Sequence, residues 1–552
     1  MRKVGDESEG AGSGRVCAQA TTAIRPMLIA RPPARGLSVT LFFLALLSVG
    51  VALYRTYGMS WDEVLQRAYG EVVYARLVLG DERGLTQGDA RFYGPVVELT
   101  FFATERALGL TDPRTIYLTR HLLTFATFCL GVWALFRVAE AHFQSWRMGL
   151  LAAALLVLSP RLFADAFYNS KDIPFLSLFS LSIYTARRYL DRQSYLAALG
   201  HALVCALLID TRIPGILVPC FTYAFLALAV IEARATSRPW RRLVGTGLAY
   251  TAALLALTTL FWPTLWPSPV ASFASAFAHM NNSPWPGFVR YFGSEISGRK
   301  LPWHYIPVWM VITTPPLYLA LSIIGLASAF AGLRTRPLFP MTRERRDVLL
   351  FLTWLFVPVL VVIVLRSTLY DGWRHLFFVY PALLLFSLCG LRALLDWAQA
   401  DRSRLVRRGT VALLVLAGTA QALAVVSFMV RAHPYQNLYF NALIGGIRGA
   451  EGKFELDYWG LSYREAFEYI LARDPRLTLR IAVSNRAGQR TVEILRRAHR
   501  ERISVFVEKS IEDADYFISH NRRGPPPSPQ AEWHAIHVDG VKVLSVFSAP
   551  RK

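Results

Sequence analysis

The sequence has few cysteines, and none of them has the spacing of a metal site. There are five in 552 residues, and the region after residue 431 has none. This scatter excludes a disulfide framework and a structural zinc site. The sequence also lacks a glycine-rich phosphate loop, a Ser/His/Asp motif and an internal repeat. It therefore carries no sign of a nucleotide-phosphate enzyme, a serine hydrolase or a repeat protein. The cysteines are Cys17, Cys129, Cys205, Cys220 and Cys389.

Acidic residues are scarce as well. The chain has 38 Asp and Glu against 60 Lys and Arg, which gives a net charge of +22. In a soluble protein this excess would suggest a nucleic-acid partner. Here the arginines gather in short loops that alternate with nearly balanced loops, which is the positive-inside pattern of a membrane protein. We therefore expect no nucleic-acid partner, a cytoplasmic N-terminus and a C-terminal segment on the external face. The arginine-rich loops cover residues 137–147, 187–192, 234–242, 334–346 and 392–408.

Long hydrophobic runs, by contrast, are frequent. Hydrophobic residues make up 54% of the chain, and the mean hydropathy of +0.34 is rare in soluble proteins. A membrane span needs roughly 20 apolar residues, so the runs predict about eleven crossings of an inner (plasma) membrane. The runs are Leu37–Tyr54, Thr115–Ala139, Leu150–Phe163, Phe175–Tyr184, Leu196–Leu208, Ile213–Val230, Leu243–Phe261, Ile306–Leu333, Val348–Leu365, Leu376–Leu394 and Thr410–Val430.

Three regions follow from this pattern. Residues 1–36 are predicted to be a disordered cytoplasmic tail, residues 37–430 a transmembrane domain, and residues 431–552 a periplasmic α/β domain. The first external loop, 55–114, is too charged to span and should form interfacial helices, one of them starting after Gly94-Pro95.

The C-terminal region has its own pattern of short elements. Helices are predicted at 460–472 and 491–500, and strands at 479–483, 503–507 and 516–519. A hairpin is predicted for 533–547, because Asp539-Gly540 between alternating runs is a strong turn signal.

Polar residues gather at the external ends of the predicted spans. Asp62 and Glu63 directly follow the first span, and further acids, bases and amides follow other spans. Charge near the bilayer core is costly, so it usually has a partner or a function. The alternative is that these residues are ordinary polar helix ends. The others are Asp165, Asn169, Lys171, Asp172, Asp210, Arg212, Tyr370, Asp371, Arg374 and His375.

This set suits a lipid-phosphate sugar donor. The donor phosphate needs arginine or lysine at headgroup depth, which Arg374, Lys171 and Arg212 can supply with the neighbouring His375. The acceptor needs a carboxylate to activate or orient it, and Asp62 fits that role. Because Glu63 is adjacent to Asp62, both cannot point the same way in regular structure. Glu63 could instead cap or position the loop.

Several motifs resemble those of a known family. The run Trp61-Asp62-Glu63 with Arg67-Ala68-Tyr69-Gly70-Glu71 resembles bacterial lipid A aminoarabinose transferases, and an Asp-Glu pair after the first span is characteristic of protein O-mannosyltransferases. The segment Tyr168–Phe175 resembles the second acidic loop of that family. The resemblance to this glycosyltransferase family 39 covers about residues 37–460. Three further segments, Tyr370–His375, His433–Gln436 and Asp457–Gly460, resemble a bacterial subgroup that depends on polyprenyl phosphate.

The resemblance implies a C-type glycosyltransferase fold and inversion at the anomeric carbon. It implies that Asp62 is the base and Asp172 a second functional carboxylate, with Glu63 beside them. It also implies a polyprenyl-phosphate-linked sugar donor and an envelope acceptor, which could be protein, lipid A or another glycan. The spacing after Asp-Glu departs from that of the aminoarabinose transferases, so no role is carried over to Arg67 and Glu71.

Other readings stay open. A polytopic lipid or glycan transporter (a flippase) would show inverted repeats and broken helices at mid-membrane, whereas the charges here lie at the rim. A non-catalytic envelope scaffold would not need the acids. A divalent metal could bind at His279, His304 and the external acids, but no ligand spacing demands one.

Overall fold

The computed structural model describes residues 32–81, 89–281, 285–335, 339–400, 403–507, 514–522 and 532–548. Most of the predicted cytoplasmic tail lies outside these ranges. The first helix, α1 (Pro32–Leu53), begins four residues earlier than the predicted end of that tail. Proline is tolerated in the first turn of a helix, where its missing N–H has no intrahelical role.

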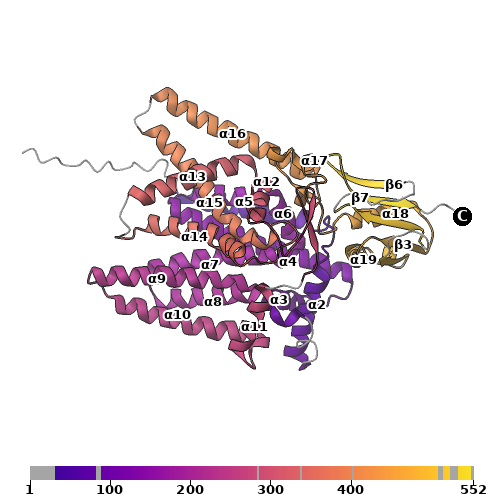
Figure 1. The fold of residues 1–552 in the computed structure, drawn as a ribbon, viewed down its shortest axis with the longest axis horizontal. Coiled ribbons are helices and arrows are strands. Elements are labelled where there is room, and N and C mark those ends of the chain that lie inside the picture. Colours follow the sequence, from indigo (N-terminus) through magenta and orange to yellow (C-terminus); the bar gives the residue numbers. More distant parts are fainter. Residues whose placement is uncertain are drawn as a thin grey trace, which may run out of the picture.

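The main body is a bundle of apolar helices (Figure 1). Within the described residues, eight helices are long and apolar enough to cross a membrane, or nine if a bent pair counts as one span. The pair is α5 (Trp146–Val157) and α6 (Pro160–Tyr168), bent by 71°. The eight are α1, α4 (Pro113–Phe143), α9 (Leu217–Ala235), α10 (Trp240–Phe261), α13 (Pro316–Thr335), α14 (Arg343–Val364), α15 (Tyr380–Gln399) and α16 (Arg404–Arg431).

All eleven predicted runs fall in helices, but not all meet the criteria for a span. Helix α7 (Asp172–Arg192) carries several charges, and α8 (Tyr195–Thr211) has 17 residues. The run expected at 306–333 is divided into α12 (Tyr305–Thr313) and α13, because Pro315 and Pro316 interrupt helical hydrogen bonding. The count of eleven crossings therefore stays a prediction.

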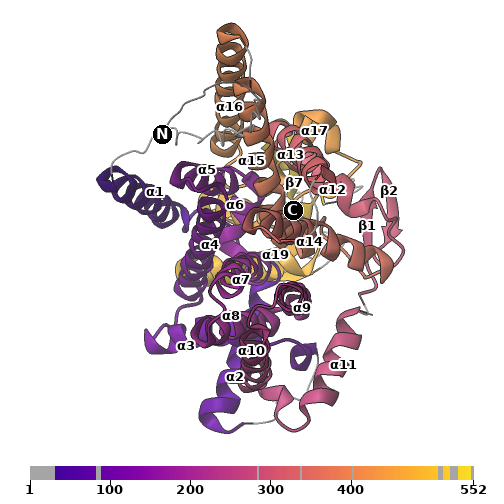
Figure 2. The same cartoon turned by 90° about the vertical axis from the view of Figure 1, so that its left-hand side faces the viewer.

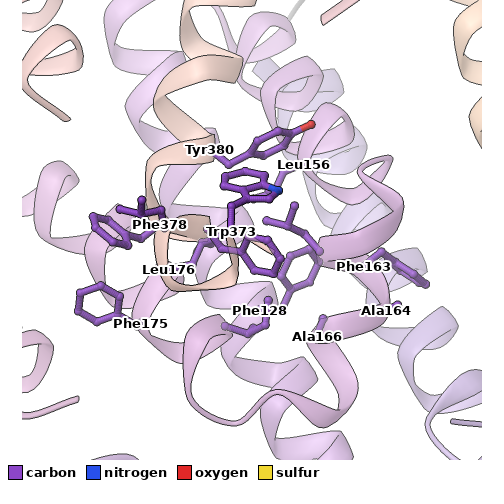
Figure 3. Close-up of a cluster of buried hydrophobic side chains, with 14 of the residues drawn as sticks. Phe128, Leu156, Phe163, Ala164, Ala166, Phe175, Leu176, Trp373, Phe378 and Tyr380 are labelled. Carbon is purple, nitrogen blue, oxygen red and sulfur yellow. The ribbon is translucent and has the colours of Figure 1, made fainter. Parts of the chain in front are cut away.

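Helix packing depends on small residues and a shared aromatic core. Figure 2 shows α4 and α7 between the group α8, α9 and α10 and the group α13, α15 and α16. In the α13–α15 contact, a Cβ at Gly325 or Gly390 would collide with a backbone carbonyl of the facing helix. Only glycine permits this close approach. Figure 3 shows the buried cluster in which Trp373 and Phe378 pack among side chains of α4 to α7.

The predicted external loops form short elements at one end of the bundle. The first loop contains α2 (Glu63–Tyr74), the π-helix η1 (Ala75–Leu79), η2 (Asp89–Phe92) and α3 (Val96–Ala107), which starts directly after Gly94-Pro95 as predicted. The second contains η4 (Pro263–Leu265), α11 (Pro269–Asn281) and the hairpin β1 (Phe288–Tyr291) with β2 (Ser294–Ser297). The remaining turns of the bundle are η3 (Ile213–Ile216) and η5 (Arg374–Val379).

After α16 the chain enters a small α/β domain that lies at the same end (Figure 1). Its five-stranded sheet has the order β4-β3-β5-β7-β6, with β3 parallel to both β4 and β5. The predicted class, an α-helical polytopic membrane bundle with a small C-terminal α/β domain, is thus confirmed. The strands are β3 (Leu479–Val483), β4 (Ile503–Val507), β5 (Tyr516–His520), β6 (Glu532–Val538) and β7 (Val541–Ser548). The helical elements are η6 (Gln436–Leu438), η7 (Ala442–Ile444), α17 (Gly446–Ala450), α18 (Tyr463–Arg473), α19 (Arg486–Thr491), η8 (Val492–Ile494) and α20 (Arg497–Arg500).

In the C-terminal domain one predicted element, the hairpin, is confirmed and another, a helix, is wrong. The predicted hairpin is present, and Asp539 (φ 46°) and Gly540 (φ 83°) both take the left-handed conformation that its turn requires. The single helix predicted for 491–500 is wrong. Helix α19 ends at Thr491, and α20 starts only at Arg497, because Leu495 and Arg496 are extended.

Reporter fusions test which end of the bundle faces the cytoplasm. In Figure 1 the helix ends that flank the α9–α10 and α13–α14 turns lie at the end away from the C-terminal sheet. Because these turns are rich in arginine, we expect a fusion after Pro337 to report a cytoplasmic location and a fusion after Gly488 an external one. A fusion after Thr236 is the control and should match Pro337. Equal signals at Pro337 and Gly488 would contradict the topology.

Candidate active site

Arg374 joins three carboxylates at the end of the bundle that carries the C-terminal domain. Its guanidinium is only 2% exposed. Nη1 donates to Asp172 Oδ2 (2.9 Å), Nη2 donates to Asp371 Oδ2 (3.0 Å), and Nη2 lies 3.5 Å from Asp62 Oδ2. Because these acids come from three distant segments, Arg374 is the centre of the cluster that the sequence predicted.

The local backbone explains how Asp371 and Arg374 face each other. Asp371 (φ 59°) and Gly372 (φ 69°) are consecutive left-handed residues, which reverse the chain within one turn before η5. Trp373 then anchors the turn, since its indole N–H donates to Thr313 Oγ1 (2.9 Å) and its ring lies in the aromatic core (Figure 3).

Asp172 is held from several sides. Besides Arg374, it pairs with Nη1 of Arg212, and its Oδ2 accepts from Asn169 Nδ2 (3.0 Å). Asn169 Oδ1 in turn accepts from the backbone N–H of Asp172 (2.8 Å), and Asn169 Nδ2 also reaches Asp165 Oδ2 (3.1 Å). Asp172 is only 1% exposed, so its oxygens are committed to fixed partners.

Asp62 differs from the other two carboxylates. Its side chain is 19% exposed, whereas those of Asp172 and Asp371 are 1% exposed. Among the described residues, its one charged partner within 4.0 Å is Arg374. Burial raises the pKa of Asp62 above its ordinary value, although Arg374 and Lys171 offset part of this rise. Asp62 is therefore the one of the three carboxylates around Arg374 that keeps access to solvent, and its pKa lies above the ordinary value.

Glu63 does not join the cluster. Its Oε2 accepts from the backbone N–H of Ser60 (2.7 Å), and its Oε1 lies 3.0 Å from His121 Nε2 on α4. The carboxylate is 2% exposed. This geometry matches the alternative in which Glu63 holds the loop that carries Asp62.

The predicted phosphate-binding residues have different surroundings. Lys171 Nζ lies 3.8 Å from the centre of the Tyr93 ring, and it forms no ion pair with any acid in the described ranges. Arg212, by contrast, is engaged by Asp172. His375 packs edge-on against Tyr370 (4.7 Å between ring centres), and its Nδ1 makes no hydrogen bond to a described residue. Lys171 is thus the predicted cation with the most freedom to bind an anion.

Two residues of the cluster escaped the sequence-based prediction. Arg522, just after β5, pairs with Asp371 Oδ1 (2.5 Å) and Glu455 Oε1 (2.9 Å). Trp459 places its ring 4.7 Å below the Arg374 guanidinium and donates from Nε1 to Asp165 Oδ1 (3.2 Å). Trp459 lies in a segment already quoted for the resemblance, but no local pattern points to Arg522.

The C-terminal domain also fixes the backbone around Asp62. Arg490 Nη1 donates to the carbonyl of Trp61 (2.6 Å), and Arg464 Nη1 donates to the carbonyls of Arg55 (2.8 Å) and Tyr57 (2.7 Å). Each of these bonds joins residues more than 400 positions apart in the chain. The loop that carries Asp62 therefore depends on the C-terminal domain for its position.

A second, buried ion network supports the first external loop. Arg120 on α4 pairs with Glu98 and Glu105 on α3, the latter at 2.9 Å. Glu105 also accepts from Arg67 Nε (2.9 Å), and Glu98 accepts from Ser170 Oγ (2.7 Å), next to Lys171 and Asp172. The network thus joins α2, α3 and α4 to the loop that carries the second carboxylate.

Replacing Arg120 by methionine should lower the free energy of unfolding by about 3–5 kcal/mol, because two buried carboxylates lose a charged partner and Glu98 keeps only the Ser170 hydroxyl among the described residues. Thermal unfolding in detergent measures this loss. The control is Arg137→Met on the same helix, since the Arg137 side chain is 37% exposed and lies 3.5 Å from Glu140. Equal shifts for the two variants would contradict the prediction.

A cavity of about 480 Å³ adjoins the cluster. The helical part contributes Trp61, Trp285, Tyr370 and Asp371 to its walls, and Tyr370 stacks on Trp285 with ring centres 4.5 Å apart. The C-terminal domain contributes the opposite wall, which consists of Tyr458, Ser484, Asn485, Arg486, Ala487, Ser519, His520 and Arg522.

The histidines considered for a metal are placed in other contacts. His279 stacks on Phe92 with ring centres 4.1 Å apart, and His304 Nδ1 lies 2.6 Å from the Tyr291 hydroxyl. Within the described residues, no group of three or more His, Cys, Asp or Glu has the arrangement of a metal site.

Comparison with family models and with curated proteins finds no match. Solved structures do show a likeness. ArnT from Cupriavidus metallidurans bound to undecaprenyl phosphate is 15% identical, with a TM-score of 0.48, over 94% of this chain and 100% of that one. The archaeal oligosaccharyltransferase AglB from Archaeoglobus fulgidus, in complex with an inhibitory peptide and a dolichol-phosphate, is 11% identical, with a TM-score of 0.49, over 87% and 70%. The arabinofuranosyltransferase AftD from Mycobacteria is 14% identical, with a TM-score of 0.41, over 95% and 40%. At these values the functional assignment depends on the site itself.

Proposed function

We propose that this protein is an inverting glycosyltransferase of the C type. It moves a sugar from a polyprenyl-phosphate-linked donor to an acceptor in the cell envelope, at the external face of the inner membrane. The observation that carries the proposal is the arrangement around Arg374, in which two carboxylates are held by arginines and Asp62 alone keeps access to solvent. This cluster lies at the end of a bundle whose apolar helices suit an isoprenoid tail.

The three acids have different roles in this proposal. Asp62 accepts the proton of the acceptor as the acceptor attacks the anomeric carbon, and its raised pKa makes it a stronger base than an ordinary carboxylate. Asp172 and Asp371 fix the guanidinium of Arg374. Glu63 is a positioning residue for the Asp62 loop.

The bond changes balance without a further reactant. The acceptor oxygen or nitrogen forms a bond to the anomeric carbon, and the bond from that carbon to the phosphate oxygen breaks. The phosphate leaves with the bonding electrons, and a cation at headgroup depth stabilises its added charge. Lys171 is the first candidate for that contact, followed by Arg374, Arg212 and His375, because Lys171 has no acidic partner in the described structure.

The same proposal names a class of donor sugar and a class of acceptor. The donor sugar is a hexose or pentose, as in mannosyl or aminoarabinosyl transfer. The acceptor is an envelope protein, lipid A or another glycan.

Comparison of the envelope with and without the gene tests the proposal. Mass spectrometry of envelope lipids, glycans and proteins should show one glycosylated species that is lost on deletion. Wild-type protein should restore it, and the Asp62→Asn variant should not. A transporter or scaffold would predict that the variant restores the species as well, and an unchanged envelope would refute the transferase.

A further inference from the structure

The C-terminal sheet has a crevice of the kind that binds ligands in α/β proteins. Strand β3 lies between two parallel neighbours, and the chain runs from β3 to β4 on one side and then back to β5 on the other. Ligands bind at the carboxyl ends of strands where the connections diverge in this way. Here that point is formed by Ser484, which follows β3, and His520, which ends β5. The two are joined by a hydrogen bond from the His520 N–H to Ser484 Oγ (3.2 Å).

This crevice opens onto the cavity beside the candidate base. The loop 484–487, Ser519 and His520 form one wall, and Trp61 and Asp371 lie in the facing wall. Trp61 directly precedes Asp62, and Asp371 pairs with Arg374. Part of a molecule bound at the crevice would therefore lie close to Asp62.

Two polar side-chain atoms of the cavity lack a hydrogen-bond partner among the described residues, although the other ring nitrogen of His520, Nδ1, lies 3.5 Å from Asn485 Nδ2. The indole Nε1 of Trp61 and the imidazole Nε2 of His520 are buried, and neither makes a hydrogen bond to a described residue. The His520 side chain is 2% exposed, with Nε2 3.5 Å from Asp457 Oδ2. Such groups are rare in a purely structural interior, where buried polar atoms are paired. Their position in the cavity walls indicates that they serve a ligand.

The cavity also has an unpaired cation. Arg486 is exposed and forms no ion pair with an acid in the described structure, whereas Arg522 is engaged by Asp371 and Glu455. A guanidinium without an acidic partner is suited to a carboxylate or phosphate. The remaining walls present aromatic rings, from Trp285, Tyr370 and Tyr458, together with hydroxyl and amide groups. Flat apolar faces combined with a few polar groups are typical of small-ligand sites, and the volume lies in their usual range.

We infer that the C-terminal domain is the acceptor-binding part of the enzyme, and that it takes a sugar bearing an anionic group, a carboxylate or a phosphate. The aromatic walls pack against the sugar ring, Trp61 and His520 bind its hydroxyl groups, and Arg486 binds the anionic group. That the bound sugar is the acceptor of a transfer rests on the proposed transferase function, whereas the binding of an anionic sugar does not.

Equilibrium binding to the full-length protein in phosphatidylcholine nanodiscs tests the inference. One pair of probes is trigalacturonic acid and its neutral galactose counterpart, and the other is glucose 6-phosphate and glucose. We expect the wild-type protein to bind at least one anionic probe about tenfold more tightly than its neutral counterpart, which is the scale of one charged hydrogen bond. Arg486→Gln should abolish that preference. Arg497→Gln is the control, since the Arg497 side chain is 83% exposed and lies outside the cavity.

Each outcome bears on the inference. If neither pair shows a preference, or if Arg486→Gln keeps it, the inference is wrong. The pair that shows the preference identifies the anionic group as carboxylate or phosphate. A transfer assay on the wild-type protein, run beside the binding measurement, separates the two proposals. Binding without any transfer by the wild-type protein would overturn the transferase and leave the anionic-sugar site intact.

Discussion

Changing Asp62 to asparagine is expected to reduce sugar transfer by at least about a hundredfold, in line with the usual contribution of a general base. The amide keeps the size of the side chain but cannot accept the acceptor's proton. Because the Asp62 carboxylate is 19% exposed and its one charged partner among the described residues lies 3.5 Å away, the change should cost little stability. Initial rates in nanodiscs with purified donor measure the effect.

A matched control lies on the adjoining helix. Glu71 is in α2, its side chain is 55% exposed, and its nearest ion-pair partner is Arg67 at 3.7 Å. Glu71→Gln should keep wild-type transfer. If Asp62→Asn also transfers at nearly the wild-type rate, Asp62 has no part in the chemistry.

The pH dependence of transfer should reflect protonation of the Asp62 carboxylate. A base acts in its unprotonated form, so activity falls as the pH drops through the pKa of that group. Because burial raises the pKa of Asp62, this loss should begin at a higher pH than for an ordinary aspartate. The measurement is the rate at limiting acceptor concentration against pH. A profile that stays flat down to the ordinary carboxylate range would contradict the assignment.

The second large effect is expected at Arg374. Lysine keeps the charge but lacks the planar fork that now serves Asp172, Asp371 and Asp62. Arg374→Lys should therefore weaken donor use about tenfold, the scale of one charged hydrogen bond, and Arg374→Ala should weaken it further. Arg212 and Arg522 still neutralise Asp172 and Asp371, which should keep the lysine variant folded.

Donor dependence of the rate separates two roles of Arg374. If it holds the donor phosphate, the KM for donor rises in both variants. If it only positions the carboxylates, kcat falls while the KM stays constant. Arg431→Lys is the control, because the Arg431 side chain is 60% exposed and lies 3.6 Å from Asp539 in another part of the molecule. Wild-type donor dependence in both Arg374 variants would leave Lys171 as the main candidate for the phosphate contact.

The sequence predicted most helices and strands correctly because these depend on local periodicity. The apolar runs lie in helices, α3 starts after Gly94-Pro95, and the hairpin turns at Asp539-Gly540. It also placed Asp62, Asp172 and Arg374 in one candidate site, since each follows or precedes a predicted span on the same face. The structure brings these three together.

Only the tertiary structure decided how the charges of the candidate site are paired. Glu63 and Asp62 are neighbours in sequence, yet Glu63 lies against His121 of α4 and Asp62 lies near Arg374. Arg522 reaches Asp371 from 151 positions away, and Arg490 reaches Trp61 from 429. Local sequence patterns contain no information about such contacts, because they depend on how the C-terminal domain docks on the helical bundle. Hydropathy and turn chemistry thus determined the secondary-structure elements. Long-range packing decided which charges are paired and which keep access to solvent.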